Sequence, residues 1–148
     1  MKILVKFPTR GRPEKFAKTL KLYQDMRGTD LVHFLITIDA DDPSMNNRRI
    51  IESLQQWGNL TVQVNSKRGK IAAINYGLDG FHQDYDIIVL ASDDMIPQVQ
   101  GWDKVIMDDM AKHYPDGDGV LWYNDGYVGK TLNTLCILGT KYFRRFGY

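Results

Sequence analysis

The chain lacks several features that would assign it to familiar classes of protein. Among its 148 residues there is one cysteine, Cys136, so neither an intramolecular disulfide nor a cysteine-based zinc site can form. The formal net charge is +1, which provides no overall field to attract nucleic acid or an anionic membrane. No run approaches the roughly 18 apolar residues of a membrane-spanning helix. We therefore expect no nucleic-acid partner, no integral membrane segment and a cytoplasmic location.

Two well-known nucleotide-binding motifs are also absent. The segment Pro8–Arg12 follows the first apolar run and contains one glycine. It matches neither the G-x-G-x-x-G fingerprint of dinucleotide-binding folds nor the Walker P-loop. Dinucleotide-dependent dehydrogenases and P-loop nucleotidases are therefore disfavoured.

Apolar runs alternate with segments of helical periodicity along the chain. This alternation is typical of an α/β protein with a mostly parallel central sheet and helices on both faces, a Rossmann-like arrangement. The expected strands are residues 2–7, 31–38, 60–64, 86–91, 120–123 and 134–138, and the expected helices are about 13–27, 50–57, 69–81, 102–114 and 140–146.

Polar residues follow four of the predicted strands. In open parallel sheets, ligands bind beyond the carboxyl ends of the strands. We therefore expect these clusters to meet at one edge of the sheet. They are Pro8-Thr9-Arg10 with Arg12, Asp39 to Asp42, Asn65 to Lys70, and Ser92 to Asp94.

Asp93 and Asp94 are the strongest chemical signal. Two adjacent carboxylates at the end of the apolar run IIVLA repel each other and gain little from burial. Mg²⁺ or Mn²⁺ would explain them, because such ions are commonly held by one or two carboxylates together with phosphate oxygens and water. The alternative is that one aspartate caps the following turn and the other is solvated.

The other clusters suit a nucleotide diphosphate. Asp39 stands where acidic residues contact a ribose or base in mononucleotide-binding folds, with Asp41 as a second ligand and Asp42 as the cap of the next helix. Arginine donors at 10 and 12 match phosphate oxygens in pairs. Arg68 and Lys70 belong to a basic segment at a helix start, where free N–H groups attract anions. A solvated basic surface is the alternative for both basic segments.

The remaining chemical side chains indicate structural roles. His33, His82 and His113 are scattered without the spacing of a metal site, and Cys136 lies in an apolar run. Residues 122–127, WYNDGY, combine aromatic rings with the turn signal Asn-Asp-Gly. The turn is the favoured interpretation, and a substrate-facing loop is the alternative.

These motifs resemble the GT-A glycosyltransferases of the large family-2 group of nucleotide-sugar-dependent, inverting enzymes. The segment KILVKFPTRGR resembles the family's opening strand and Pro-Thr turn, and Ser92-Asp93-Asp94 resembles its D-x-D metal motif with serine in the first acidic position. Asn65, Gly69, Ala72, Asn75 and Gly77 resemble its N-x-x-x-G…A…N-x-G pattern, and residues 135–148 resemble a later strand and helix ending in Phe-Gly-Tyr.

The resemblance implies a GT-A nucleotide-sugar-binding fold in one domain, residues 1–148. Residues 1–96 would bind the nucleotide, and residues 97–148 would form an acceptor-side part that is short or truncated. By this analogy Thr9 and Asp39 contact the nucleoside, Asp93 faces the ribose or the water shell of the metal, and Asp94 binds the metal. Pro8 belongs to the same donor-binding turn.

The implied reaction transfers a sugar, most simply from a UDP-sugar, to an acceptor hydroxyl with Mn²⁺ or Mg²⁺. The acceptor is an unknown glycan, lipid or small molecule. The family usually carries its catalytic carboxylate after the Phe-Gly-Tyr segment, and this sequence ends at Tyr148, so we expect the chain to lack that carboxylate. Within the chain, Asp125 is the only candidate base. The alternatives are a non-catalytic nucleotide-sugar-binding domain, a nucleotidyltransferase, and a doubly wound domain without a ligand.

Overall fold

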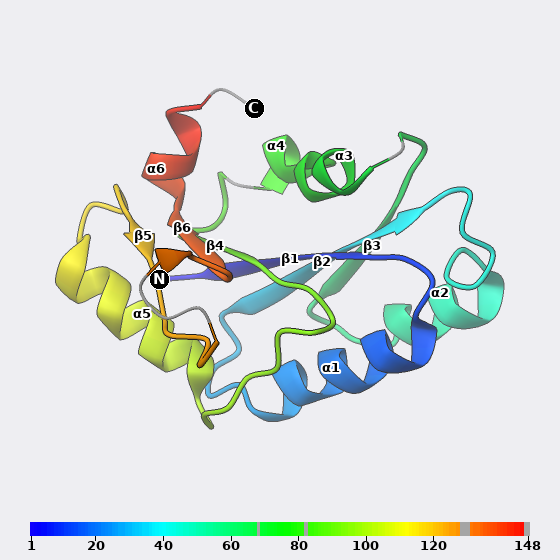
Figure 1. Cartoon of the computed structure of the whole chain (residues 1–148), viewed down its shortest axis with the longest axis horizontal. Helices are drawn as coiled ribbons and strands as arrows, with labels where there is room; N and C mark the ends of the chain where they lie inside the picture. The colour runs from blue at the N-terminus through cyan, green and yellow to red at the C-terminus, as the bar shows by residue number, and fades with distance from the viewer. Residues whose placement is uncertain (68, 82, 128–130, 147–148) are drawn as a thin grey trace.

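A six-stranded β-sheet lies between two layers of helices in the computed structural model of the chain (Figure 1). The structure describes residues 1–67, 69–81, 83–127 and 131–146. The strands are β1 (Ile3–Thr9), β2 (Val32–Asp39), β3 (Leu60–Asn65), β4 (Ile87–Leu90), β5 (Val120–Leu121) and β6 (Cys136–Gly139). Their order across the sheet is β3-β2-β1-β4-β6-β5.

Parallel pairing dominates the centre of this sheet. Strand β1 pairs in parallel with both β2 and β4, and β2 pairs in parallel with β3. Strand β6 runs antiparallel to both β4 and β5. The predicted mostly parallel sheet is confirmed, and β1 to β4 all have their carboxyl ends at one edge.

The helices cover both faces of the sheet, as predicted. Helices α1, α2 and α5 lie on one face, and α3, α4 and α6 lie on the other (Figure 1). Their bounds are α1 (Pro13–Asp25), α2 (Arg48–Gln55), α3 (Lys70–Asn75), α4 (Leu78–Phe81), α5 (Trp102–His113) and α6 (Thr140–Arg144). None of the helices within the described residues has both the length and the apolar character that crossing a bilayer requires.

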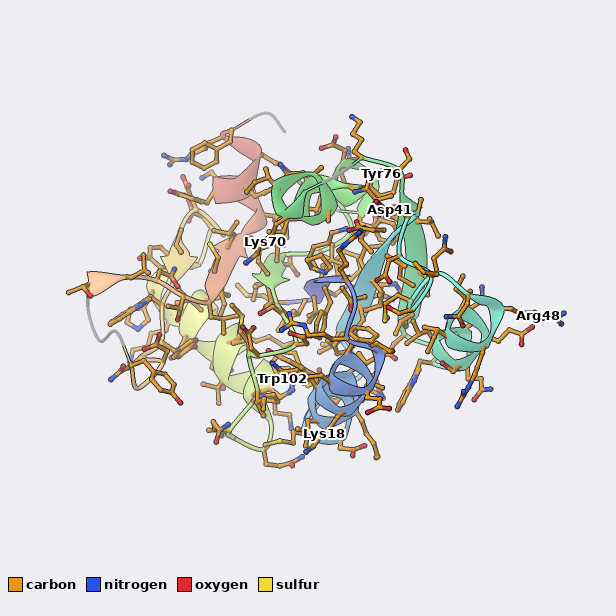
Figure 2. All side chains as sticks on the ribbon, turned by 45° about the vertical axis from the view of Figure 1, so that its right-hand side comes forward. Lys18, Asp41, Arg48, Lys70, Tyr76 and Trp102 are labelled. Carbon is orange, nitrogen blue, oxygen red and sulfur yellow. The ribbon has the colours of Figure 1, made fainter. Side chains whose placement is uncertain are left out.

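The larger hydrophobic core lies between the sheet and helices α1, α2 and α5. Side chains alternate between the two faces of a strand, so Ile3, Val5 and Phe7 of β1 all enter this core. Tyr23 of α1 and Trp102 of α5 meet edge to face, with ring centroids 5.2 Å apart. Trp102 also donates a hydrogen bond from Nε1 to the Tyr23 carbonyl, 3.0 Å away, which fixes α5 against α1. Figure 2 labels Trp102 near α1.

The helix predicted at residues 69–81 is interrupted in the structure. It forms the short helices α3 and α4, because the backbone of Tyr76 is extended and Gly77 has φ +79°. Glycine tolerates this left-handed conformation, whereas a side chain there would also collide with Gln63 of β3. The apolar periodicity continued across the break, so it did not reveal the interruption.

The cap of α2 also differs from the prediction. Asn47, and not Asp42, is the N-cap, and its side chain accepts a hydrogen bond from the Ile50 N–H at 3.1 Å. Asp42 instead accepts from the Gly11 N–H at 2.7 Å and from the hydroxyl of Ser44 at 2.6 Å. It therefore links the loop after β1 to the loop after β2.

Asp103 is a fully buried carboxylate that joins α5 to the loop after α1. It accepts hydrogen bonds from Gly28 N at 2.6 Å, from Thr29 N at 2.8 Å and from the Thr29 hydroxyl at 2.7 Å. Such a carboxylate is tolerated in the interior because its oxygens are well supplied with donors.

We expect Asp103→Ala to lower the free energy of unfolding by about 3 kcal/mol, because it leaves two backbone N–H groups without their partner. The control is Asp30→Ala, whose side chain is 97% exposed and which should change stability by less than about 0.5 kcal/mol. Urea denaturation of both variants measures the difference. If Asp103→Ala is as stable as Asp30→Ala, Asp103 does not anchor the loop after α1.

Candidate functional site

The predicted polar clusters meet in one cavity of about 750 Å³ at the carboxyl edge of the sheet. Arg68 lies outside the described residues, and Asp125 lines a second cavity beside the first. The other predicted site residues all line the first cavity: Pro8, Thr9, Arg10, Arg12, Asp39, Asp41, Lys70, Asp93 and Asp94. We call it the donor cavity, after the nucleotide-sugar donor that the sequence predicts for it. Asp42 lies behind it as the link described above.

Arg10 bridges two acidic side chains at one side of the donor cavity. Its Nη1 lies 2.9 Å from Asp39 Oδ2 and 2.5 Å from Asp41 Oδ1. The hydrogen bonds to Asp41 and Asp39 raise the pKa of the guanidinium further above its usual range. Asp39 is 8% exposed, so this partner holds an otherwise buried carboxylate in place at the end of β2.

Asp93 lies at the opposite side of the cavity, just after β4, and is 4% exposed. Its Oδ1 is 2.9 Å from Arg12 Nη2 and 4.0 Å from Lys15 Nζ. The Thr19 hydroxyl donates to the Asp93 carbonyl at 2.9 Å, which fixes the backbone against α1. Both arginines predicted to bind phosphate thus face carboxylates in this structure.

Among the described residues, two buried polar atoms of the donor cavity have no hydrogen-bond partner. They are Thr9 Oγ1, at the end of β1, and Asp93 Oδ1. The Arg12 contact is close enough to neutralise Asp93, but its angles are not those of a hydrogen bond. Buried polar groups are rarely left unsatisfied, so these atoms have capacity for ligand hydroxyls or amides.

Asp94 differs from its neighbour because its side chain is exposed. The Ser92 hydroxyl donates a hydrogen bond to Asp94 Oδ1. This hydrogen bond lowers the pKa of Asp94, and the positive charges of Lys15 and Arg12 act in the same direction. The carboxylate is therefore ionised at neutral pH and open to a cation.

The side chains around Asp94 fit a metal ion that takes most of its ligands from a substrate and from water, and few from the protein. In the described part of the chain, no three carboxylate, imidazole or thiolate side chains gather into a preformed metal site. Mg²⁺ commonly uses one or two carboxylates and completes its shell with substrate phosphates and water. An ionised Asp94 beside an open cavity suits that kind of site and does not suit a closed structural one.

The basic segment is held at the cavity edge by Asn65, the last residue of β3. Its side chain accepts from the Lys67 N–H at 3.0 Å and donates to the Lys67 carbonyl at 2.8 Å. Gly69, with φ +104°, then turns the chain into α3. Lys70 lies at the start of α3, above the end of β4, whereas Arg48 of α2 points away from the sheet (Figure 2).

The predicted turn at Asn-Asp-Gly is present. Asn124 Oδ1 accepts from the Gly126 N–H at 3.0 Å, and Asp125 Oδ1 accepts from the Tyr127 N–H at 2.8 Å. The other oxygen of Asp125 accepts from the Thr134 hydroxyl at 2.8 Å, and Thr134 lines the donor cavity. The same segment can therefore form the turn and also face the donor cavity.

The histidines and the cysteine have the following positions. His33 lies in β2, where its Nε2 is 2.9 Å from the Thr61 hydroxyl and its ring stacks on Phe81, and burial lowers its pKa. His113 is the last residue of α5, and residue 82 lies outside the described residues. Cys136, expected to be buried, is half-buried in the wall of the donor cavity.

Sequence reasoning missed Lys6, a fully buried lysine in the central strand β1. Its Nζ donates to the Thr37 hydroxyl and, at 2.5 Å, to the Tyr76 carbonyl at the end of α3. Desolvation lowers the pKa of the ammonium to about 8. A charged residue inside an apolar strand was the available signal, because it requires a partner in the fold.

No protein family and no curated protein matches this chain at a significant level, but solved structures share its fold. A mannosyltransferase from Pyrobaculum calidifontis, in complex with GDP-Man and Mn²⁺, aligns with TM-score 0.73 and 15% identity over 99% of this chain and 46% of that chain. S. aureus TarS 1–349 in complex with UDP gives TM-score 0.75 and 14% identity over 99% and 49%.

A third solved structure broadens the comparison. The 4-diphosphocytidyl-2C-methyl-D-erythritol synthase of Anaerococcus prevotii aligns with TM-score 0.62 and 12% identity over 99% of this chain and 76% of that chain.

This chain has a Rossmann-like GT-A fold. The predicted fold class is thereby confirmed, and the two glycosyltransferases and the synthase share this fold. The chain spans about half the length of the two glycosyltransferase chains. At these identities the likeness concerns the fold, so the activity must be argued from the site itself.

The buried Lys6 should make the free energy of unfolding rise with pH above about pH 8. Its folded pKa of about 8 is below the roughly 10.4 of an unfolded lysine, so between these values the unfolded chain binds more protons. We expect the free energy of unfolding of the native protein, relative to Lys6→Met, to rise by about 2 kcal/mol from pH 8 to pH 10.

Chemical denaturation of both proteins at several pH values measures this difference. Burial shifts the pKa values of Tyr23, Tyr123 and Cys136 too, in their case upward. Both proteins contain these groups, so their effects on stability cancel in the comparison. Parallel pH profiles for the two proteins would contradict a buried, desolvated ammonium.

Proposed function

We propose that this chain binds a nucleotide diphosphate sugar and transfers its sugar to an acceptor hydroxyl, as a metal-dependent glycosyltransferase. The observation that supports this most is the pair of buried, unsatisfied atoms, Thr9 Oγ1 and Asp93 Oδ1, in a cavity that also holds arginines and an ionised Asp94. A nucleoside diphosphate with its cation has hydroxyl, amide and phosphate groups of matching chemistry.

The donor would lie across the carboxyl edge from β2 to β4. Thr9 and Asp39 would contact the nucleoside, with Pro8 and Asp41 beside them, and Asp93 would accept a hydrogen bond from a ribose hydroxyl. The phosphate-binding cations would be Arg10, Arg12, Arg68 and Lys70. Arg10 and Arg12 would then exchange part of their contact with carboxylates for phosphate oxygens.

Asp94 would hold Mn²⁺ or Mg²⁺ together with phosphate oxygens of the donor. Bound there, the ion would neutralise the charge that develops on the leaving diphosphate. Ser92 supports this role, because its hydrogen bond keeps Asp94 ionised and fixes the orientation of the carboxylate.

In the transfer step, an acceptor oxygen forms a bond with the anomeric carbon of the sugar. The bond from that carbon to the diphosphate oxygen breaks, and the diphosphate leaves with the electron pair. The acceptor's proton passes to a general base, for which we propose Asp125. Asp125 lines a cavity that Asp94 also lines, and this supports an acceptor-side role for it.

The structural comparisons support this proposal through what two of the related proteins bind. The mannosyltransferase was solved with GDP-Man and Mn²⁺, and TarS was solved with UDP. A non-catalytic domain that binds the donor would have the same cavity. Measuring sugar transfer to an acceptor distinguishes it from an enzyme.

A nucleotidyltransferase is the second candidate, because the 4-diphosphocytidyl-2C-methyl-D-erythritol synthase shares the fold over 76% of its own chain. Such an enzyme joins a nucleoside triphosphate to a phosphorylated substrate and releases pyrophosphate. The loop Pro8–Arg12, with its single glycine, gives less backbone room around a triphosphate than a glycine-rich loop would. Pyrophosphate release from CTP or UTP with sugar phosphates, absent with UDP-sugars, would favour this candidate.

We expect Asp94→Ala to weaken metal-dependent UDP binding at least tenfold, because it removes the protein's main ligand to the cation. Calorimetric titration of UDP, with and without Mn²⁺, measures this effect. The control is Asp108→Ala, which removes an exposed carboxylate on α5 outside both cavities and should leave binding unchanged.

The titration is repeated with GDP if UDP does not bind. If the folded native protein binds neither nucleotide with Mn²⁺, the donor cavity does not have the function proposed. If Asp94→Ala binds as tightly as the native protein, the metal ligand lies elsewhere.

We expect Asp125→Asn to slow sugar transfer roughly 100-fold while donor affinity stays the same, because an amide cannot accept the proton. The amide oxygen can still accept the Tyr127 N–H, so the turn should persist. UDP release from a panel of UDP-sugars, with water as acceptor, measures the rate. An unchanged rate would exclude Asp125 as the base.

A further inference from the structure

A second cavity of about 960 Å³ adjoins the donor cavity. It lies between the segment that follows Asp94, helix α5 and the loop that precedes β6. Asp94, Met95 and Thr134 line both cavities, so the two are adjacent. A molecule in the second cavity that contacts Asp94 would therefore lie at the boundary of the donor cavity.

The floor and the walls of the second cavity are mainly apolar. Trp102 and Ile106 of α5 form part of its floor and belong to the buried core. Its walls include Ile96, Val99 and Tyr127, whose side chains are exposed. Apolar side chains gathered at a concave surface favour a ligand that removes them from water.

The carboxylate side chains of the second cavity lie beside its boundary with the donor cavity. Asp94 lines both cavities, and Asp125 is hydrogen-bonded to the shared residue Thr134. The two carboxylates disfavour an anionic group at this end. They suit hydroxyl groups, which can donate hydrogen bonds to them.

We propose that the second cavity holds the acceptor, and that the acceptor is an uncharged hydroxyl compound with an apolar alkyl or aryl body. The hydroxyl end would lie against Asp94 and Asp125, and the apolar body would cover Ile96, Val99 and Tyr127. This inference rests on the proposed function, because a group transfer requires the second reactant to lie beside the donor. The volume is within the usual range for a small-molecule site.

The size of the apolar body gives the proposal a measurable consequence. Each methylene group that is buried contributes up to roughly a fourfold gain in affinity. We expect hexyl β-D-glucoside to bind at least tenfold more tightly than methyl β-D-glucoside. Hexanoate should bind at least tenfold more weakly than hexyl β-D-glucoside, because its charge would face carboxylates.

Titration of the ¹⁵N-labelled protein, followed by NMR, measures these affinities and shows where each probe binds. Shifts centred on the amides of residues 95, 96, 98, 99 and 134–137, with affinity rising with alkyl length, are expected. Equal affinities for the two glucosides, or shifts centred on other parts of the chain, would overturn the proposal.

A matched pair of variants tests the location independently. Val99→Asp places a charge in the wall of the second cavity and should remove most of the gain from the hexyl chain. Ile71→Asp makes the same change at an exposed position of α3 outside both cavities and should retain the gain. The proposal fails if both variants retain it, or if Val99→Asp converts a native dimer to a monomer in light scattering, since the cavity would then be an interface between copies.

The two proposals fail in different ways. If the native protein binds UDP with Mn²⁺ but shows no dependence on alkyl length, the acceptor class is wrong and the donor cavity keeps its assignment. If alkyl glucosides bind in the second cavity but no nucleotide diphosphate binds, the apolar site exists and the glycosyltransferase proposal is wrong.

Discussion

The parallel pairing of β1 with β2 and β4 is the constraint on which the candidate site depends. It places Thr9, Asp39 and Asp93, which are far apart in the sequence, at one edge of the sheet. Backbone hydrogen bonds fix the register of these strands, and the alternation of apolar side chains prevents a slip by one residue. A slip would carry Phe7 out of the core and Thr9 away from the cavity.

Internal charge compensation is the second feature of the site. Arg10 pairs with both Asp39 and Asp41, and Arg12 pairs with Asp93, so two arginines offset part of the negative charge of these three carboxylates. A diphosphate with a divalent cation carries the same two kinds of charge. When it binds, the arginines would exchange contacts with carboxylates for contacts with phosphate, and a carboxylate would gain contact with the cation. New ion pairs would thus replace those that are lost, and this limits the electrostatic cost of opening the site.

The fold and the outline of the site followed from local patterns in the sequence. The run IIVLA ending at Ala91 predicted a buried strand, and the polar residues after four of the strands predicted one shared edge. The turn at Asn124 was also predictable, because Asx side chains hydrogen-bond their own backbone. These features depend on neighbouring residues, and neighbouring residues are visible in a sequence.

Contacts between distant segments could not be predicted in the same way. The sequence by itself determined which residues form strands and which polar groups follow them, because side-chain periodicity and turn chemistry act over a few residues. Only the tertiary structure decided that Arg10 and Arg12 face carboxylates, that Lys6 supports the end of α3, and that a second cavity adjoins Asp94. These arrangements arise from the packing of elements against the sheet, and no local pattern records which side chains that packing brings together.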